Sequence, residues 1–441
     1  MPAGFGAGHH FLIEQCARLV PICEMGSNLR AIRLAFSLVS FSSLSVFGQW
    51  FPVDSGTTNN LNGAYLLDSG TGFVVGDGGT ILKTTDAGAT WVPLTSGTAR
   101  TLHDVYLFNP DEGVAVGEHG LILRTTDGGA VWQRVASGVQ DSLRSVFFSG
   151  VNGICGGDSQ TILYSTDSGA SWQIGQTGFF GGGFPGAHML SPSIGFVAGQ
   201  NSIFQPLVGN TTDGGVSWNF HAFYFDNNEG GCTDLRFLDV NTGVVSGIVF
   251  DGRGAIARTT DGGINWSTLF FDQAIEGVDF PVTNASQIGF AVGWSGRILH
   301  TTNAGVTWIA QTSGTSTNLN DVSVVTDGLT GIAVGEGGII LRTTNGGEPL
   351  PITLSAAKRK VGGINTVRLT WSGATSTDID VYRCVRQVGG HECDPMLIVT
   401  TANDGSYIDS TGDTGRSRYR YRVCEAATAT CSNDVRVRFQ Q

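Results

Sequence analysis

Short segments in which apolar and polar residues alternate recur along residues 49–351. In one unit, LHDVYLF (102–108), GVAVG (113–117) and LILRT (121–125) each have the length and composition of a β-strand. A glycine-containing turn then leads to a fourth short segment, WQRVA (132–136). The same order recurs around GFVVGDGGTILKT and GFAVGWSGRILHT. Each unit therefore predicts a small sheet of four antiparallel strands.

The turn before each fourth segment carries the motif S/T-x-D/N-x-G-x-x-W, which recurs every 40–48 residues. That period is the length of a four-stranded propeller blade. Asp or Asn accepts hydrogen bonds from the turn backbone, glycine takes a positive φ, and Trp packs a large apolar face. The motif therefore predicts hairpins, not catalysis. Its residues are Asp86, Asp127, Asp167, Asp213, Asp261, Asn303 and Asn345, with Trp91, Trp132, Trp172, Trp218, Trp266 and Trp308.

The seventh copy of the motif, TTNGGEPLP at 343–351, lacks its tryptophan. The missing strand is found at the other end of the repeats, because residues 49–62 align with residues 90–103. Trp50 then takes the place of Trp91. The seventh repeat is therefore split across the chain.

We predict that Trp50–Asp54 pairs beside the strand Ile339–Thr343 and completes the last blade. The predicted fold class is all-β: a seven-bladed β-propeller at 49–351, closed by an N-terminal strand.

Residues 352–441 are predicted to form a second domain, because the balance of basic and acidic residues changes there. The first range has 10 Lys and Arg against 26 Asp and Glu, and the second has 12 against 9. The acidic propeller excludes nucleic acid as its ligand, since phosphates would be repelled.

The repeat S/T-x-D-x-G-x-x-W resembles the Asp-box, or BNR repeat, of sialidases, sortilin-type receptors, xyloglucanases and photosystem II stability/assembly factors. The form GxAVGxxGxILxTxDGGxxW is most similar to the assembly factor family, over about residues 49–347. This resemblance implies a non-catalytic binding or assembly scaffold that engages a protein partner on the face opposite the Asp-boxes. The family is associated with an arginine patch, for which Arg100, Arg144 and Arg236 lie at plausible positions.

The turns between second and third strands place acidic residues on the face expected to bind a ligand. They would form an acidic ring at the channel mouth that attracts a cationic segment or a divalent ion; alternatively they are solvated turn residues. The candidates are Asp77, Glu118, Asp158, Asp251 and Glu336, with Trp294 at the equivalent position in another blade.

Three connections between blades are rich in aromatic residues. Clustered aromatics at one sector of the rim favour a protein- or glycan-binding patch, and the alternative is that they are buried in the blades. The candidates are Phe179, Phe180, Phe184, Phe223 and Phe225.

Enzymatic motifs are absent from the sequence: it contains no HExxH, no metal-spaced CxxC and no G-x-S-x-G. No catalytic residue, metal or cofactor is therefore assigned. The alternative function is a secreted carbohydrate-active hydrolase, xyloglucanase- or sialidase-like, or a glycan-binding protein. A glycosidase would need two carboxyl groups about 5–9.5 Å apart.

Residues 25–48 have the layout of a secretory signal, with Arg30 and Arg33 before an apolar run. We therefore expect residues 1–24 to be a non-native upstream extension. We expect a secreted, periplasmic or cell-surface monomer that binds a protein client or surface glycan, with no stable membrane span after signal removal. The alternative is an uncleaved membrane anchor.

Residues 352–441 resemble a fibronectin type III β-sandwich, with an early core tryptophan, Trp371, and the late strand SRYRYRVCEA at 417–426. Arginines alternate with tyrosines along that strand, which predicts a solvated face or a site for an anionic partner. Close cysteine pairs in an exported β domain favour disulfides, with buried free thiols as the alternative. The expected pairs are Cys384 with Cys393 and Cys424 with Cys431.

Overall fold

The computed structural model describes residues 50–68, 70–177, 182–281, 287–348, 352–374, 378–386, 396–426 and 431–440. They all belong to the compact unit 45–441. The regular structure of these described residues is made of β-strands and three short 3-10 helices, which are η1 (Asp77–Gly79), η2 (Trp294–Gly296) and η3 (Glu336–Gly338). The predictions for residues 1–48 lie outside the described residues and stay predictions.

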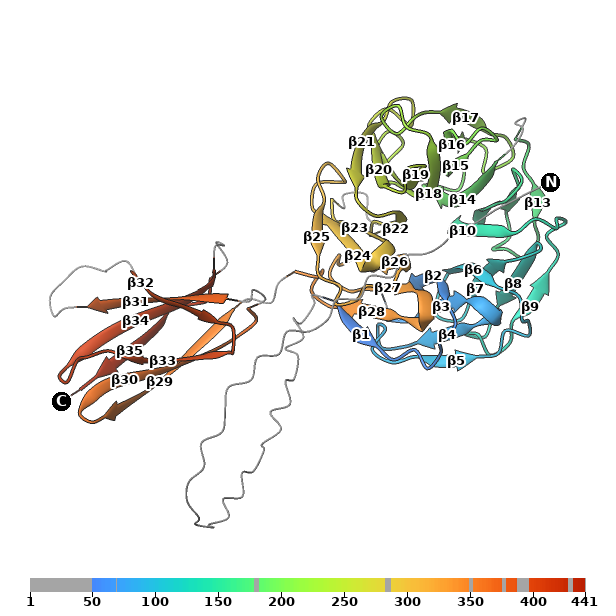
Figure 1. Cartoon of the computed structure of the whole chain (residues 1–441). Helices are drawn as coiled ribbons and strands as arrows, with labels where there is room; N and C mark the ends of the chain where they lie inside the picture. Colours follow the sequence, from blue (N-terminus) through green and yellow to red (C-terminus); the bar gives the residue numbers. More distant parts are fainter. Residues whose placement is uncertain are drawn as a thin grey trace, which may run out of the picture. The chain divides into compact units, whose positions relative to one another are not determined.

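Seven four-stranded antiparallel sheets form a ring in the described part of residues 50–343 (Figure 1). The first strand of each sheet packs against the first strand of the next, and β26 packs against β2. In ring order the sheets are β2 (Leu61–Leu66), β3 (Gly72–Gly76), β4 (Ile81–Thr84), β5 (Val92–Leu94); β6 (Leu102–Leu107), β7 (Gly113–Gly117), β8 (Leu121–Thr125), β9 (Gln133–Val135); β10 (Leu143–Ser149), β11 (Asn152–Gly157), β12 (Ile162–Ser165), β13 (Gln173–Ile174); β14 (Gly183–Met189), β15 (Gly195–Gln200), β16 (Pro206–Thr211), β17 (Asn219–Ala222); β18 (Gly230–Phe237), β19 (Gly243–Val249), β20 (Gly254–Thr259), β21 (Ser267–Phe271); β22 (Ile275–Asp279), β23 (Gly289–Gly293), β24 (Arg297–Thr301), β25 (Ile309–Gln311); and β26 (Leu319–Val324), β27 (Gly331–Gly335), β28 (Ile340–Thr343), β1 (Phe51–Val53).

The N-terminal strand closes the ring. β1 pairs antiparallel with β28, and Phe51 lies opposite Arg342. Gly338 lies against the chain that follows β1 and has a φ of +77°. A side chain on Gly338 would come within 2.0 Å of the carbonyl oxygen of Thr57. Only glycine permits that approach. The predicted pairing of residues 50–54 beside 339–343 is confirmed.

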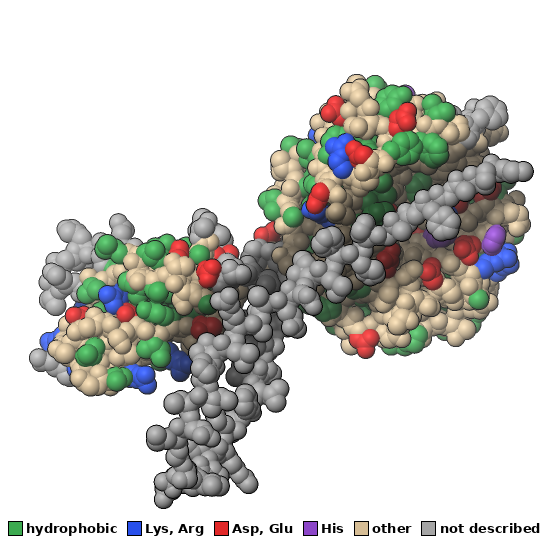
Figure 2. Space-filling model, viewed as in Figure 1, with side chains coloured by type: hydrophobic (Ala, Val, Ile, Leu, Met, Phe, Trp, Pro, Cys, Tyr) green, Lys and Arg blue, Asp and Glu red, His purple; other side chains and the backbone are tan. Residues whose placement is uncertain are grey.

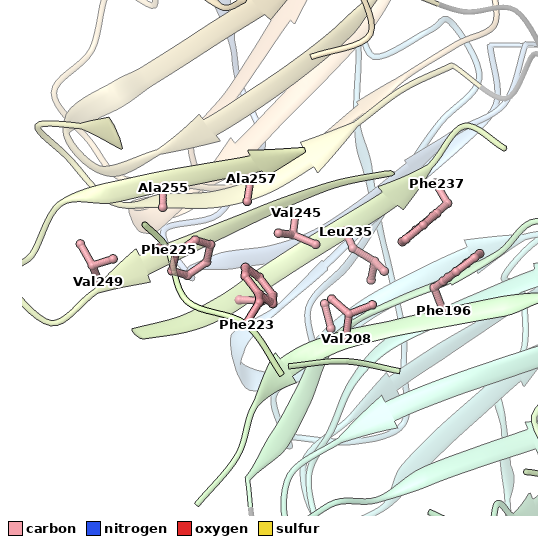
Figure 3. Packing of buried hydrophobic residues seen from close by; sticks show 12 residues of the cluster. Phe196, Val208, Phe223, Phe225, Leu235, Phe237, Val245, Val249, Ala255 and Ala257 are labelled. Carbon is pink, nitrogen blue, oxygen red and sulfur yellow. The ribbon is translucent and has the colours of Figure 1, made fainter. Parts of the chain in front are cut away.

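Apolar side chains fill the space between neighbouring sheets. Figure 3 shows the cluster between the sheet of β14–β17 and that of β18–β21, with Phe223 and Phe225 inside it. Trp266 packs against this cluster, and its ring stacks on that of Phe223 with centroids 4.9 Å apart. Phe196 and Phe237 stack in the same cluster. The hydrophobic core therefore consists of separate clusters of side chains, one between each pair of neighbouring sheets, as a closed ring of sheets requires.

The Asp-box is a hydrogen-bonded hairpin turn, as its residues predict. In the fourth copy, the Asp213 carboxylate accepts the backbone N–H of Ser217 at 2.9 Å and the hydroxyl of Thr211 at 2.7 Å. Trp218 Nε1 donates to the carbonyl of Gly215 at 3.0 Å. Such bonds stabilise the charged carboxylate, and they lower the pKa of Asp86 and of Asp261 to about 2.

The C-terminal domain is a sandwich of two sheets within the described residues, in the orders β29-β30-β33 and β32-β31-β34-β35. Trp371 and Leu369 from one sheet pack with Tyr419 and Tyr421 from the other. The assignment as fibronectin type III-like stays a prediction. The strands are β29 (Thr353–Val361), β30 (Ile364–Ser372), β31 (Asp378–Arg386), β32 (Met396–Ala402), β33 (Ser406–Ser410), β34 (Ser417–Glu425) and β35 (Val435–Phe439).

Cys424 and Cys431 are joined by a disulfide in the structure. Cys393 lies outside the described residues, so its pairing with Cys384 stays a prediction. Cys155 and Cys232 are buried free thiols in the propeller.

Candidate functional site: the acidic mouth of the channel

The first strands of the seven sheets surround a hollow of about 560 Å³. It opens on the side of the turns between second and third strands, because Asp77, Glu118 and Glu336 all line it. The Asp-box turns join third to fourth strands and so lie at the opposite face. In Figure 2 acidic side chains, in red, can be followed along the hollowed part of the propeller.

A bulge near the start of every first strand shapes the wall of this channel. In β6 the register shifts between Leu102 and Asp104, and the other six first strands have a shift at the corresponding place. A bulge re-aims side chains, so both His103 and Asp104 line the channel although they are neighbours in sequence. The channel therefore carries more polar groups than strict alternation allows.

Three aspartates at the bulges each connect one sheet to the next sheet in the ring. Each is the residue at which pairing resumes after the register shift of its strand, and each accepts a backbone N–H from the following first strand. Burial raises the pKa of Asp104 to about 6 and that of Asp321 well above its usual range. The bonds run from Val146 to Asp104 at 2.8 Å, from Val278 to Asp234 at 3.1 Å, and from Ala64 to Asp321 at 2.8 Å.

Arg236 lies deep in the channel between two buried carboxylates. Its Nε donates to Asp279 at 3.0 Å, its Nη1 pairs with Asp234 at 3.3 Å, and its guanidinium lies 5.4 Å from the ring centre of Phe147. The Arg236 side chain is 16% exposed. Arg236 is therefore not part of an exposed arginine patch, which corrects the sequence-based expectation: the bulge and the two acids hold it inside.

Arg144 lies at the mouth but is neutralised by a carboxylate. Its Nε and Nη2 donate to Asp158 at 3.0 and 2.8 Å. Asp251 is paired in the same way with Arg253 at 2.6 Å, and neither Asp158 nor Asp251 lines the channel. These two predicted members of the acidic ring therefore supply no free negative charge to it.

Four carboxylates do face the mouth: Asp77, Glu118, Glu276 and Glu336. Each accepts a hydrogen bond from a neutral group, such as Trp294 Nε1 to Glu276 at 2.6 Å. No Lys or Arg of the described residues pairs with them within 4 Å. Burial raises the pKa of Glu276, and the negative charge of Glu336 adds to the effect.

The predicted aromatic patch is not an exposed surface. Phe184 and Phe225 are fully buried and Phe223 is 8% exposed, because they fill gaps between sheets. That part of the prediction is wrong, and the alternative of buried residues holds. Phe179 and Phe180 lie outside the described residues. Trp294 is 42% exposed and holds Glu276 at the mouth.

Sequence reasoning missed Glu276 and the buried acids Asp104, Asp234, Asp279 and Asp321. A usable signal was present, because Asp104, Asp234 and Asp321 each follow a buried apolar residue of the first strand by two positions. Over the described residues, no group of three or more His, Cys, Asp or Glu side chains is arranged to hold a metal ion. No helix of the described part is long and apolar enough to cross a membrane.

The opposite pKa shifts predict a stability maximum in mildly acidic solution. Asp104 is an acid with a raised folded pKa, so the folded state gains protons, and stability, as pH falls from about 7 toward 5. Asp86 and Asp261 have depressed pKa values, so their contribution is lost as pH falls through about 4 toward 2. We expect urea-unfolding free energies to peak between about pH 4 and 6.

The matched control is Asp104→Asn, which should reduce the slope of stability against pH between about pH 5 and 7 and leave the loss of stability below about pH 4 unchanged. A stability that rises steadily from mildly acidic to mildly alkaline solution would contradict the assignment.

The family described as photosynthesis system II assembly factor YCF48 matches residues 43–137, 93–177 and 187–329, which together exceed half of the chain. The chain belongs to this YCF48 family. No curated protein sequence matches it significantly.

Solved propellers agree with the fold. The chain is 22% identical to YCF48 bound to D1 peptide, with 68% of this chain and 98% of that chain covered and a TM-score of 0.54. YCF48 from Cyanidioschyzon merolae is 17% identical, with 67% and 98% covered and a TM-score of 0.53. The GH74 enzyme of Niastella koreensis is 13% identical, with 87% and 73% covered and a TM-score of 0.52. At these identities the likeness shows the fold alone.

Proposed function

We propose that this YCF48-family propeller is a non-catalytic binding scaffold whose channel mouth engages a positively charged segment of a protein partner. The observation that carries the proposal is the set of four mouth carboxylates, for which the described residues provide no pairing cation. They surround a hollow of about 560 Å³, large enough for several side chains of an inserted segment. Electrostatic complementarity would steer such a segment to the mouth.

Two further observations support this role. The family is one of assembly factors, and a similar propeller has been solved with a bound peptide. In this chain the mouth is acidic and both Arg144 and Arg236 are paired with carboxylates, so the segment that we propose as its partner is cationic. We also propose that the protein acts outside the cytoplasm, on the strength of the signal-like segment at 25–48.

The test uses a defined cationic probe. An oligolysine peptide should bind the protein in calorimetry, and the affinity should fall as salt is added. Glu118→Gln with Glu336→Gln should weaken binding at least tenfold, since two carboxylates near one site contribute more than about 1.4 kcal/mol together.

The matched control removes two carboxylates from the Asp-box face, by Asp111→Asn with Glu348→Gln. Equal affinities for the two double variants would show that only net charge matters and would defeat the proposal. Native partners cross-linked to the protein in its own cells should show the same dependence on Glu118 and Glu336.

A glycoside hydrolase is the second candidate, and one observation favours it. Glu276 and Glu336 belong to adjacent sheets and both line the mouth, and the raised pKa of Glu276 is the property of a general acid. A panel of polysaccharides should be tested with the wild type, Glu276→Gln and Glu336→Gln. Turnover abolished by both variants would replace the scaffold proposal, whereas no turnover on any glycan supports the scaffold.

A further inference from the structure

One end of the C-terminal domain carries an exposed aliphatic turn. Gly362 and Gly363 join β29 to β30 with positive φ angles of 57° and 82°. Val361 and Ile364 flank them and are 49% and 38% exposed. No atom lies within 4 Å of where a side chain on either glycine would begin. The hairpin therefore projects two aliphatic side chains into solvent.

Six cations gather around this hairpin. Lys358 Nζ donates to the carbonyl of Arg438 at 2.7 Å, so β29 lies beside the end of β35. Lys360 Nζ donates to the carbonyl of Thr414 at 3.1 Å, which joins the hairpin to the turn before β34. We call this end the basic tip; it comprises Lys358, Arg359, Lys360, Val361, Ile364, Arg416, Arg418 and Arg438.

The cations of the basic tip have no ion-pair partner within 4 Å among the described residues, whereas Arg420 and Arg422, farther along β34, share Asp434. Arg418 and Arg438 lie directly opposite each other on adjacent strands, an arrangement that costs stability. Asp413 is an acid beside the hairpin, and its carboxylate accepts hydrogen bonds from the hydroxyls of Ser417 and Tyr419. Asp378 and Glu425 lie at the other end of the domain, at the ends of their strands.

Protection of a sheet edge accounts for only part of this pattern. Lys and Arg on β29, an edge strand, would block pairing with another chain. β34 is an interior strand, so Arg418 has no such role, and exposed aliphatic residues at an edge hairpin would favour aggregation rather than prevent it. The combination therefore points to a ligand that offers both negative charge and an apolar layer.

We propose that the basic tip docks the domain onto an anionic lipid surface, independently of the function proposed for the propeller. Val361 and Ile364 would enter the headgroup region, and the surrounding cations would bind lipid phosphates. A soluble polyanion requires charge alone, so the aliphatic pair favours lipid. Thr353, where the chain enters the domain, lies at the other end of β29, about 25–30 Å away. The basic tip is thus the end of the domain far from the propeller linker.

The experiment is sedimentation of the full chain with vesicles of equal parts phosphatidylcholine and phosphatidylglycerol, compared with pure phosphatidylcholine. We expect binding to the anionic vesicles. Lys358→Gln, Arg359→Gln and Lys360→Gln together should weaken it by roughly fivefold for each cation removed. Val361→Ser with Ile364→Ser should also weaken it severalfold, because two aliphatic side chains lose their apolar contact.

The controls change residues away from the basic tip. Leu397→Ser with Ile408→Ser replaces two exposed aliphatics of the same domain, and Arg100→Gln, Arg134→Gln and Arg297→Gln remove three charges from the propeller. These controls should bind as the wild type does. Every variant keeps residues 1–49, so the leader contributes equally to all measurements.

Two results would overturn the proposal. One is equal binding by the wild type and both tip variants, which would place the membrane contact elsewhere. The other is binding that depends on the cations but not on Val361 and Ile364 and that dextran sulfate abolishes completely, which would identify a general polyanion site. Unchanged thermal unfolding of the tip variants establishes that a loss of binding is not a loss of folding.

Discussion

Replacing Trp50 with alanine is expected to lower the free energy of unfolding of the propeller by about 3–5 kcal/mol. Trp50 is 1% exposed, packs edge-on against Phe290 with ring centroids 5.7 Å apart, and donates its Nε1–H to Gln311 at 2.8 Å. The strand that follows it, β1, has only three residues, and none of them is buried. The side chain of Trp50 is therefore the main apolar anchor of the strand that closes the ring.

Urea unfolding followed by circular dichroism measures this effect. Trp50→Phe keeps most of the packing and loses the hydrogen bond, so it should cost much less than alanine. Phe51→Ala is the neighbouring control, and because Phe51 is 42% exposed it should change stability by under about 1 kcal/mol. A Trp50→Ala protein as stable as the Phe51→Ala protein would mean that the ring does not depend on this anchor.

The sequence predicted the closure because a local motif was incomplete at one place and duplicated at another. The closure follows from two features of the sequence: TTNGGEPLP is not followed by a fourth strand, and residues 49–62 supply one. The turn formed by the Asp-box was equally predictable, since its hydrogen bonds connect residues a few positions apart, such as Asp213 and Ser217. Local chemistry of this kind is visible in a single sequence.

The prediction of an exposed aromatic patch failed because the exposure of these side chains depends on the neighbouring sheet. Phe223 lies just beyond the end of β17 and packs on Trp266 of the following sheet, and Phe225 is enclosed in the same cluster. Composition alone does not distinguish an aromatic residue at the rim from one that fills the space between two sheets. The distinction requires the distance between sheets, which only the closed ring defines.

The channel acids were missed because strict alternation assigns them to the wrong face. In β6, Leu102 and Val105 are buried while His103 and Asp104 line the channel. The bulge therefore changes the apolar spacing from two residues to three. The same spacing recurs in β2 and β26. An apolar pattern of i, i+3 and i+5 in every first strand is thus the sequence signal for the bulge, and it identifies the side chains that face the channel.

Replacing Arg236 with methionine is expected to lower the free energy of unfolding at neutral pH by about 3–5 kcal/mol, because two buried carboxylates lose their cation. Asp234 and Asp279 have side chains that are 14% and 12% exposed, and Arg236 lies between them. Burial already raises the pKa of both acids, and the guanidinium opposes that rise. Without it the folded state would hold protons on these acids more tightly than the unfolded chain does.

The pH dependence of the Arg236→Met protein separates this electrostatic cause from lost packing. Acids with a raised folded pKa make folding more favourable as pH falls, so the deficit relative to wild type should be smaller at about pH 5 than at pH 7. Adding Asp279→Asn to Arg236→Met should restore part of the stability at neutral pH, since one uncompensated charge is removed. A deficit that is the same at both pH values and that Asp279→Asn worsens would show that Arg236 acts through its packing on Phe147 and not as the counter-charge of the channel.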